Sequence, residues 1–246
     1  MKTIRIFLCM VVMAVLMPII AIANPLLDEM DTLTTKGNVD NLKKSIELGL
    51  KAVSAEPESY EANWKLARSY AYYLHALQQH LVPGWEEECK VVGKKGMTYA
   101  EEAMKLEPDK PEGRYFFAFS AGMYSYGISI LGAIKEGLKG KTQNNFEKVY
   151  AMDKNYDQGW CAVSLARFWH QLPWPLKNKE KALEYYREFQ AMPFYAKDAN
   201  SRVLFGDLLA DMGDKHKKEA KEILDVAMKT CSEYYMAIAK EAMKKL

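Results

Sequence analysis

The histidines and cysteines of this sequence do not form the patterns that catalysis or metal binding requires. His75 and His80 are five positions apart, whereas two metal ligands on one helix face need a spacing of three or four. Cys89, Cys161 and Cys231 show no spacing typical of a metal site. The sequence also lacks the H-E-x-x-H and G-x-S-x-G motifs and a phosphate-binding glycine loop. We therefore predict no catalytic residues, no metal site and no cofactor.

Aromatic side chains are the residues best suited to binding. They crowd three segments, around residues 64–73, 115–124 and 160–169. Aromatic walls suit apolar or amphipathic ligands, although many such rings pack in a protein core instead, and that alternative stays open. The residues that we select as candidate ligand-binding positions are Tyr70, Tyr73, Phe119, Tyr124, Trp160, Trp169 and Trp174.

Trp174 differs from the other candidates because it stands between two prolines in "QLPWPLKNK". It is the best single candidate for the edge of a pocket or for a docking contact. The alternative is a plug that packs the joint between two helices. Pro173 and Pro175 are expected to end one helix here, and Asn178 can cap the next.

Four glycines, Gly122, Gly127, Gly132 and Gly137, recur every five residues. Such small residues could line a tunnel for an apolar ligand. The alternative, which we favour, is that they allow close packing of helices or act as flexible joints. The three cysteines that follow residue 23 are an odd number for a disulfide framework. We expect them to be small buried residues, with a single disulfide as the alternative.

The first residues, "MKTIRIFLCMVVMAVLMPIIAIANP", predict export. Two basic residues precede an apolar run, which ends at the A-x-A site of residues 21–23. We predict a signal peptide over residues 1–23 and one domain over residues 24–246. The alternative is an uncleaved membrane anchor, because the apolar run approaches the length of a span. Cys9 lies too near the start for a lipoprotein signal, so the sequence does not favour a lipid anchor.

The composition is that of a packed globular protein with protein or small-molecule partners. Of 246 residues, 49% are hydrophobic, which excludes a disordered chain. The formal net charge is +2, and removal of residues 1–23 takes away two basic and no acidic residues, which leaves zero. No basic stripe remains for nucleic acid or an anionic membrane surface.

The elements are predicted to be helices throughout. In "NLKKSIELGLKAVSAEP", Leu42, Ile46, Leu50 and Val53 form one helical stripe. The next segment has a comparable face, comprising Ala62, Leu66, Ala67, Tyr70 and Tyr73. No alternating run between turn residues predicts a strand. The fold class is all-α.

The helices repeat. "KAVSAEPESYEANWKLA", "EAMKLEPDKPEGRYFFA" and "KVYAMDKNYDQGWCAVSLA" each place a small or β-branched residue five positions before a proline or its equivalent: Ala52, Ala103 and Val149. This pattern resembles the tetratricopeptide repeat, in which several helix pairs must stack to bury their apolar faces. The repeats are 51 and 46 residues apart instead of about 34. The added length lies between the helices of a pair, in "LVPGWEEECK", "YGISILGAIKEGLKGK" and "QLPWPLKNK".

The repeats predict a tetratricopeptide-like helical-hairpin solenoid of about four pairs with extended joints. The fourth pair turns at residues 212–214, and "CSEYYMAIAKEAMKKL" is expected to cap the end.

Three segments carry a more specific resemblance: "GRYFFAFSAGMYSYG", "ILGAIKEGLKGKTQNNFEKVYAMDKNYDQGW" and "FWHQLPWPLKNKEKALEYYREF". Over about residues 60–210 the chain resembles the T component associated with TRAP transporters. The resemblance implies an accessory to a periplasmic solute-binding protein, which feeds organic acids or other small solutes to an ion-driven importer. It also implies helices around a pore or cavity, with a homo-oligomer as one option.

The function hypothesis is therefore a non-catalytic periplasmic accessory. It would bind a small, partly apolar or organic-acid solute, a solute-binding protein, or both. The alternative is a tetratricopeptide scaffold for protein–protein interaction in the cell envelope, which would use its concave groove for a peptide or another envelope protein. Nucleic acid is not an expected partner.

Overall fold

The structure is a computed structural model that describes residues 25–246. The predicted signal peptide, residues 1–23, lies outside the described residues. Within residues 25–246 the chain forms α-helices and three short 3-10 turns and no strand, which confirms the all-α prediction. No helix of this part of the chain combines the length and the apolar character that crossing a membrane would need.

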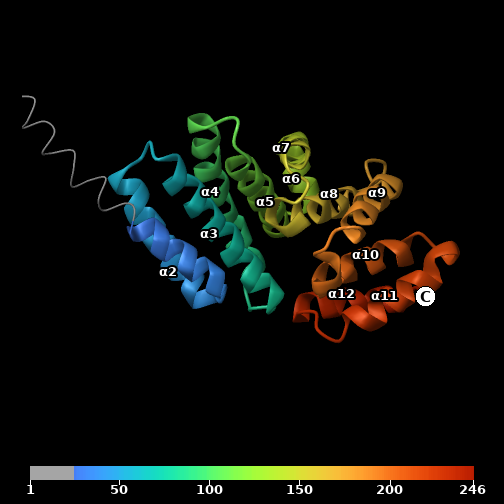
Figure 1. The fold of residues 1–246 in the computed structure, drawn as a ribbon. Coiled ribbons are helices and arrows are strands. Elements are labelled where there is room, and N and C mark those ends of the chain that lie inside the picture. The colour runs from blue at the N-terminus through green and yellow to red at the C-terminus, as the bar shows by residue number, and fades with distance from the viewer. Residues whose placement is uncertain (1–24) are drawn as a thin grey trace, which may run out of the picture.

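The helices form antiparallel pairs stacked in chain order (Figure 1), which confirms the tetratricopeptide-like solenoid. Helical residues 25–36 precede the first labelled helix. The bounds are α2 (Val39–Ala55), α3 (Tyr60–Gln79), α4 (Trp85–Leu106), α5 (Pro111–Ile128), α6 (Ile130–Lys135), α7 (Leu138–Met152), α8 (Trp160–Gln171), α9 (Lys179–Gln190), α10 (Ala199–Asp211), α11 (Lys217–Ala227) and α12 (Glu233–Met243). The pairs α3–α4, α5–α7, α8–α9 and α10–α11 are the four expected ones. Residues 25–36 add a fifth pair with α2.

The repeated small positions lie where the helices of neighbouring pairs meet. Ala52, Ala103 and Val149 are all completely buried. Each lies in the last turn of its helix, four residues before the residue that caps the helix. A small or β-branched side chain there lets the next helix approach closely, as the sequence pattern predicted.

The stripe predicted for α2 is partly wrong. Leu42 is buried, but Leu50 is 41% exposed. The face that packs against α3 contains Ser45, Gly49 and Ala52 instead. An added Cβ on Gly49 would lie 2.9 Å from Leu66 Cδ1. The small residues of α2 therefore face α3, because they let the two helices pack more closely than Leu50 would at the same contact.

The three joints differ from one another. Only a short loop joins α3 to α4, because Trp85 already begins α4, so most of the first insertion is added helix. The second insertion contains α6. The third is a turn over residues 172–178, where the Asn178 side chain accepts a hydrogen bond from the Lys181 N–H at 2.8 Å and so caps α9 as predicted. The Trp174–Pro175 peptide bond is cis.

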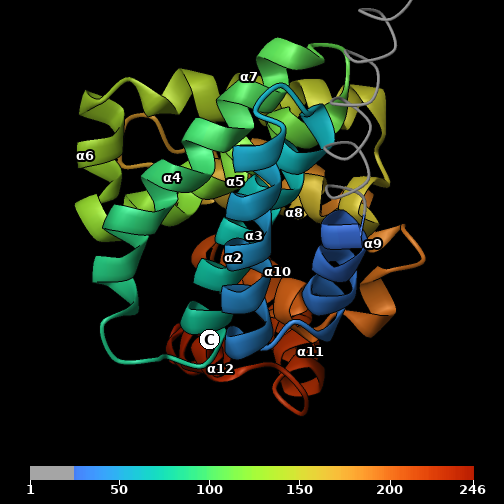
Figure 2. The ribbon, with the colours of Figure 1, turned by 90° about the vertical axis from the view of Figure 1, so that its left-hand side faces the viewer.

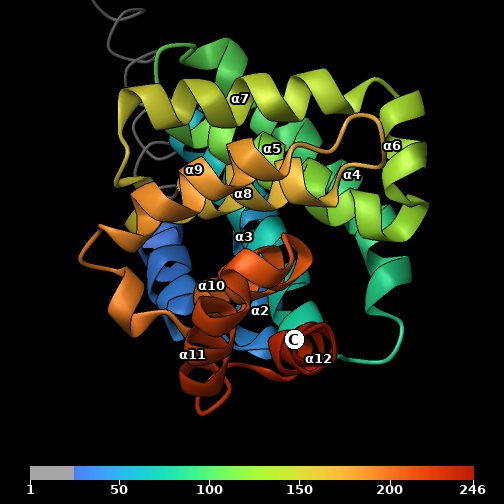
Figure 3. The same cartoon turned by 90° about the vertical axis from the view of Figure 1, so that its right-hand side faces the viewer.

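The last pairs turn back toward the first ones. Seen from the side in Figures 2 and 3, α12 lies next to the loop that joins α3 to α4. The rings of Trp85, in the first turn of α4, and Tyr234 of α12 are 6.0 Å apart. The predicted cap helix, α12, therefore not only covers α11 but also packs the C-terminal end of the solenoid against the second pair, α3–α4.

Candidate ligand-binding cavity

Two tyrosines of α12 make the closing contacts. The hydroxyl of Tyr235 lies 3.1 Å from Nε2 of His75 on α3. The hydroxyl of Tyr234 donates to that of Tyr126 on α5 over 3.1 Å. Tyr235 is buried, so its hydroxyl needs a partner within the protein. These contacts hold α12 over the concave side of the helical pairs.

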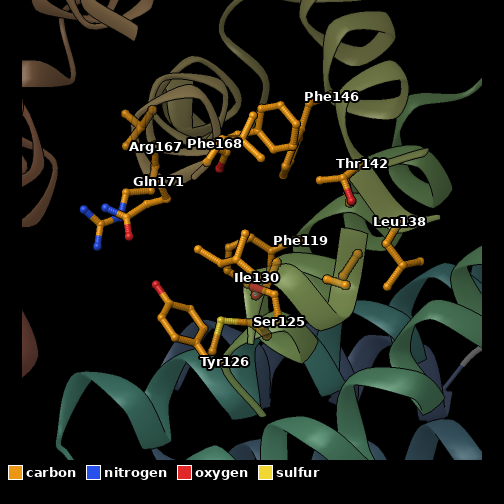
Figure 4. Close-up of a pocket in the computed structure, with 18 of the residues that line it drawn as sticks. Phe119, Ser125, Tyr126, Ile130, Leu138, Thr142, Phe146, Arg167, Phe168 and Gln171 are labelled. Atoms are coloured by element: carbon orange, nitrogen blue, oxygen red, sulfur yellow. Dashed lines mark hydrogen bonds between the residues drawn. The ribbon is translucent and has the colours of Figure 1, made fainter. Parts of the chain in front are cut away.

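A cavity of about 210 Å³, partly open to solvent, lies between α12 and the concave side of the helical pairs. Its walls come from α3, α5, α6, α7, α8, α10 and α12. Figure 4 shows the lining side chains around the empty centre. Most of the lining is apolar, and representative residues are Phe119, Ile130, Ile134, Leu138, Phe146 and Trp160. A hollow of this kind with few polar groups is typical of sites for small organic molecules.

The joint between α5 and α7 supplies one wall. Ser129 ends α5 with a φ of 70°, and its side chain accepts a hydrogen bond from the Gly132 N–H, which starts α6 in a new direction. Gly137 then takes a φ of 75° and starts α7. The left-handed conformation suits glycine, whereas it is unfavourable for serine and persists because the surroundings fix it. Without these two turns α6 could not cover the cavity.

The four evenly spaced glycines serve different purposes. Gly122 lines the cavity, and an added Cβ there meets no atom within 4 Å. An added Cβ on Gly127 would lie 2.5 Å from the backbone nitrogen of Lys90, so this glycine allows α4 and α5 to pack closely. Gly137 is a joint. Gly122 therefore agrees with the hypothesis that the glycines line a tunnel. Gly127 and Gly137 agree with the alternative of close helix packing or joints.

Polar groups gather at one end of the cavity. In Figure 4, Arg167 and Gln171 of α8 lie on the side to which the Tyr126 hydroxyl points, and Leu138 lies on the opposite side. Arg167 Nη1 is 3.5 Å from Asp207 Oδ2, and its side chain is 18% exposed. Gln78 of α3 also lines the cavity. It is 3% exposed, and its side-chain nitrogen has no hydrogen-bond partner in the described chain.

His75 stands in the wall between this cavity and a second hollow. Burial lowers the pKa of His75 to about 4, so the imidazole is neutral near pH 7. Its Nε2 also lies 3.3 Å from Nε2 of Gln79. His75, Phe119 and Trp160 line both hollows and therefore form the partition between them.

The second hollow is a polar groove of about 760 Å³ between α3 and the segment that precedes α10. Asp157 lines it and has a φ of 49°, in the left-handed region. Both oxygens of this carboxylate accept tyrosine hydroxyls, from Tyr72 at 3.1 Å and from Tyr115 at 2.6 Å. Burial raises the pKa of Asp157, and the tyrosine hydrogen bonds oppose that rise. Backbone strain of this kind often marks a functional surface.

The candidate residues chosen from the sequence lie in three environments. Phe119 and Trp160 line the cavity. Tyr70, Tyr73 and Tyr124 are buried core residues and line neither hollow.

The two remaining candidates lie elsewhere. Trp169 is half-buried, with the Lys181 ammonium 4.3 Å from its ring centroid. Trp174 is 89% exposed, so it does not plug the helix joint.

Several cavity residues were not among the candidates: Gln78, Tyr126, Phe146, Arg167, Tyr234 and Tyr235. A signal existed for Arg167, because it is the only Lys or Arg in the mostly apolar helix "WCAVSLARFWHQ", which has no acidic residue. A lone cation on such a helix indicates a buried charge with a partner. The α12 tyrosines carry no comparable local signal.

The cysteines are free thiols, as we expected, and the disulfide alternative is not observed. Cys89 and Cys161 are buried, whereas Cys231 is half-buried. Within the part of the chain that the structure describes, no three His, Cys, Asp or Glu side chains are grouped so that they could hold a metal ion.

Comparison with known proteins identifies a matching family and similar solved structures. The model of the family described as regulator of microtubule dynamics protein 1-3 matches residues 26–160. No curated protein matches the sequence. Among solved structures, the crystal structure of MamA protein aligns with a TM-score of 0.47 and 16% identity, over 91% of this chain and 93% of that chain.

Proposed function

This chain belongs to the family of regulator of microtubule dynamics protein 1-3, and from that premise we propose that it is a non-catalytic helical-repeat binding protein whose closed superhelix holds a small, partly apolar solute. The observation that carries the proposal is the cavity to which α12 adds a wall through the His75–Tyr235 contact. An open solenoid would present a continuous concave groove instead. Here that surface is divided into an apolar cavity and a polar groove.

The lining of the cavity supports the choice of solute. Its aromatic and aliphatic walls would bury the apolar part of a ligand and so supply most of the favourable free energy of binding. Its volume of about 210 Å³ lies below the range of roughly 300–1,000 Å³ that drug-sized ligands occupy. The proposed solute is therefore small.

The cellular part of the proposal is an exported accessory of a TRAP-type importer in the periplasm. It is supported by the signal-peptide pattern of residues 1–23 and by the sequence resemblance to the T component. The exposed Trp174 offers a surface on which a periplasmic solute-binding protein could dock. A homo-oligomer is compatible with the same surface.

A neutral fluorescent probe tests the solute-binding proposal. N-phenyl-1-naphthylamine, which becomes fluorescent in apolar surroundings, is titrated into the purified protein. Gly122→Leu should weaken its binding about tenfold or more, because the added side chain points into the cavity. The matched control is Gly140→Leu, since Gly140 is also helical with open space at its Cβ but does not line the cavity. Equal binding by wild type and both variants would contradict the proposal.

A second function, a scaffold for polypeptides, is favoured by the polar groove beside α3. Its volume of about 760 Å³ and its polar lining would suit an extended peptide. Lys197 is exposed on its rim. If the groove binds an envelope protein, Lys197→Glu should weaken that complex and leave probe binding unchanged. Gly122→Leu should weaken probe binding and leave the complex unchanged. Neither variant changing polypeptide binding would contradict the scaffold function.

A further inference from the structure

We propose that the cavity binds a single-chain monocarboxylate in one orientation, with the carboxylate at Arg167 and Gln78 and the hydrocarbon chain toward Leu138 and Phe146. This inference rests on the proposed function and names the chemical class of its ligand. It follows from the separation of polar and apolar groups within one cavity.

The guanidinium of Arg167 has hydrogen-bonding capacity to spare. It carries five N–H donors in a planar fork, which suits a carboxylate. Its ion pair with Asp207, at 3.5 Å, occupies only part of that capacity. Asp207 is also held by Lys245, whose ammonium lies 3.1 Å from the other carboxylate oxygen. The charge of Asp207 is thus shared between two cations.

The wider cluster behind Arg167 has an excess of positive charge. Asp211 is paired with Lys179 at 3.1 Å and lies 3.8 Å from Lys177. Burial is the main cause that lowers the pKa of His170 to about 4, against the opposing effect of Asp207, so this imidazole adds no charge near pH 7. Four cations therefore face two carboxylates: Arg167, Lys177, Lys179 and Lys245 against Asp207 and Asp211. An anionic ligand would balance part of this excess.

Gln78 is the second observation and is independent of the charge cluster. It comes from α3, whereas the cluster comes from the C-terminal half of the chain. Its side-chain nitrogen is a buried donor that lines the cavity and has no partner in the described residues. Buried donors in native proteins are almost always satisfied. A carboxylate oxygen in the cavity would supply the missing acceptor.

The opposite end of the cavity is lined mainly by α7. Leu138 and Thr142 lie on the side opposite Arg167 in Figure 4, and Phe146 lies between the two sides, next to Phe168. Lys139 is the other lysine or arginine of the lining. Its ammonium donates to Gln143 at 3.3 Å and lies 5.6 Å from the ring centroid of Trp169, which places it beside other partners. Arg167 is therefore the lining cation that we assign to the carboxylate, and a ligand bound there would direct its chain toward Leu138.

Competition against N-phenyl-1-naphthylamine tests the orientation with three probes: decanoate, decanol and succinate, each below any concentration that forms micelles. Decanoate has chain and charge, decanol has the chain alone, and succinate has charge without a chain. We expect decanoate to displace the fluorophore at a concentration about tenfold or more below that of decanol. Succinate should not displace it.

Two variants assign the carboxylate to its partners. Arg167→Gln and Gln78→Leu should each bring the decanol-to-decanoate ratio of inhibition constants closer to one. The ratio is measured within one variant, so a general loss of stability does not imitate the result. Gln78→Leu should also fold normally, because its side-chain nitrogen contributes no hydrogen bond.

The outcomes separate the two proposals. A ratio near one in the wild type would overturn the carboxylate inference, while fluorophore binding that Gly122→Leu abolishes would leave the solute-binding function standing. An unchanged ratio in both variants would overturn the assignment to Arg167 and Gln78. Absence of fluorophore binding together with absence of decanoate binding would overturn both proposals.

Discussion

Nε2 of His75 and the hydroxyl oxygen of Tyr235 are 3.1 Å apart, although the two residues are separated by 160 positions in the sequence. Their rings meet edge to face with centroids 6.5 Å apart. This contact joins α3 to α12 and makes one side of the cavity. The protein is thus a solenoid whose end is fastened to its second helix pair, and its binding surface depends on that fastening.

Removing the hydroxyl of Tyr235 should loosen this contact. Tyr235→Phe keeps the ring but loses the hydrogen bond, which should lower the free energy of unfolding by about 1 kcal/mol. Urea denaturation measures the change, and hydrogen exchange should show faster exchange in α12. The control is Lys240→Ala on the exposed face of the same helix. Equal effects of the two substitutions would contradict the closing role of Tyr235.

Acid should destabilise the fold through its buried histidines. Burial lowers the pKa of His75 and of His170 to about 4, whereas an unfolded chain has histidine pKa values near 6.5. Between pH 6.5 and 4 the unfolded state binds more protons than the folded state. The stability due to neutral histidine is therefore complete above pH 6.5 and is lost as the pH falls toward 4.

At pH 5 this loss should be about 2 kcal/mol for each histidine. Thermal unfolding at pH 7.5, 6 and 5 measures it, and His75→Gln should flatten the dependence. A melting temperature that rises on acidification from pH 7.5 to 5 would show that the sign is wrong.

Two glycines of α5 should respond in opposite ways to the same substitution. Gly127→Ala would place a methyl group 2.5 Å from the Lys90 nitrogen and 2.7 Å from the Glu86 oxygen, both backbone atoms of α4. It should destabilise the protein by about 2 kcal/mol. Gly122→Ala meets no atom within 4 Å and should stabilise the helix by up to about 1 kcal/mol. Urea midpoints compare them, and similar values would contradict the packing described for α4 and α5.

Trp174 should contribute little to the stability of a single chain. Because its side chain is 89% exposed, Trp174→Ala should change the free energy of unfolding by less than about 0.5 kcal/mol. Trp160→Ala is the contrasting variant and should cost about 3 kcal/mol, since Trp160 packs against the core. A large loss in Trp174→Ala that depends on protein concentration would instead place this side chain in a contact between chains.

The cysteines should react as three free thiols of different accessibility. Burial raises the pKa of Cys89 to about 12 and also raises that of Cys161, so both should resist a thiol reagent in the native protein. Cys231 should react first. Titration of a chain without residues 1–23 should give three thiols after denaturation without reductant. A count of one would show a disulfide and contradict the structure.

The helical pairs could be predicted from the sequence because their signals are local. The prolines after α2 and α4, the cap at Asn178 and the buried small positions such as Ala103 each act within a few residues. The first helix was missed because residues 25–36 follow the apolar segment and precede the first recognisable repeat. The α2 stripe was misplaced because Gly49 permits a closer approach than leucine does.

The site could be predicted only in part, because it depends on contacts between distant segments. Phe119 and Trp160 were selected as aromatic residues and do line the cavity. Tyr70 and Tyr124 have the same local appearance but face the core. Which aromatic faces the hollow depends on the rotation accumulated from pair to pair, and the return of α12 depends on the sum of those rotations. No short window of sequence contains that information.

The most direct test of the central claim is native mass spectrometry of the protein recovered from the cell envelope, alongside Gly122→Leu prepared in the same way. The account predicts a wild-type chain that begins after Ala23 and carries a small bound molecule, which is lost in Gly122→Leu and retained in Gly140→Leu. An empty wild-type protein that retains a polypeptide partner would contradict the solute-binding account and leave the scaffold function.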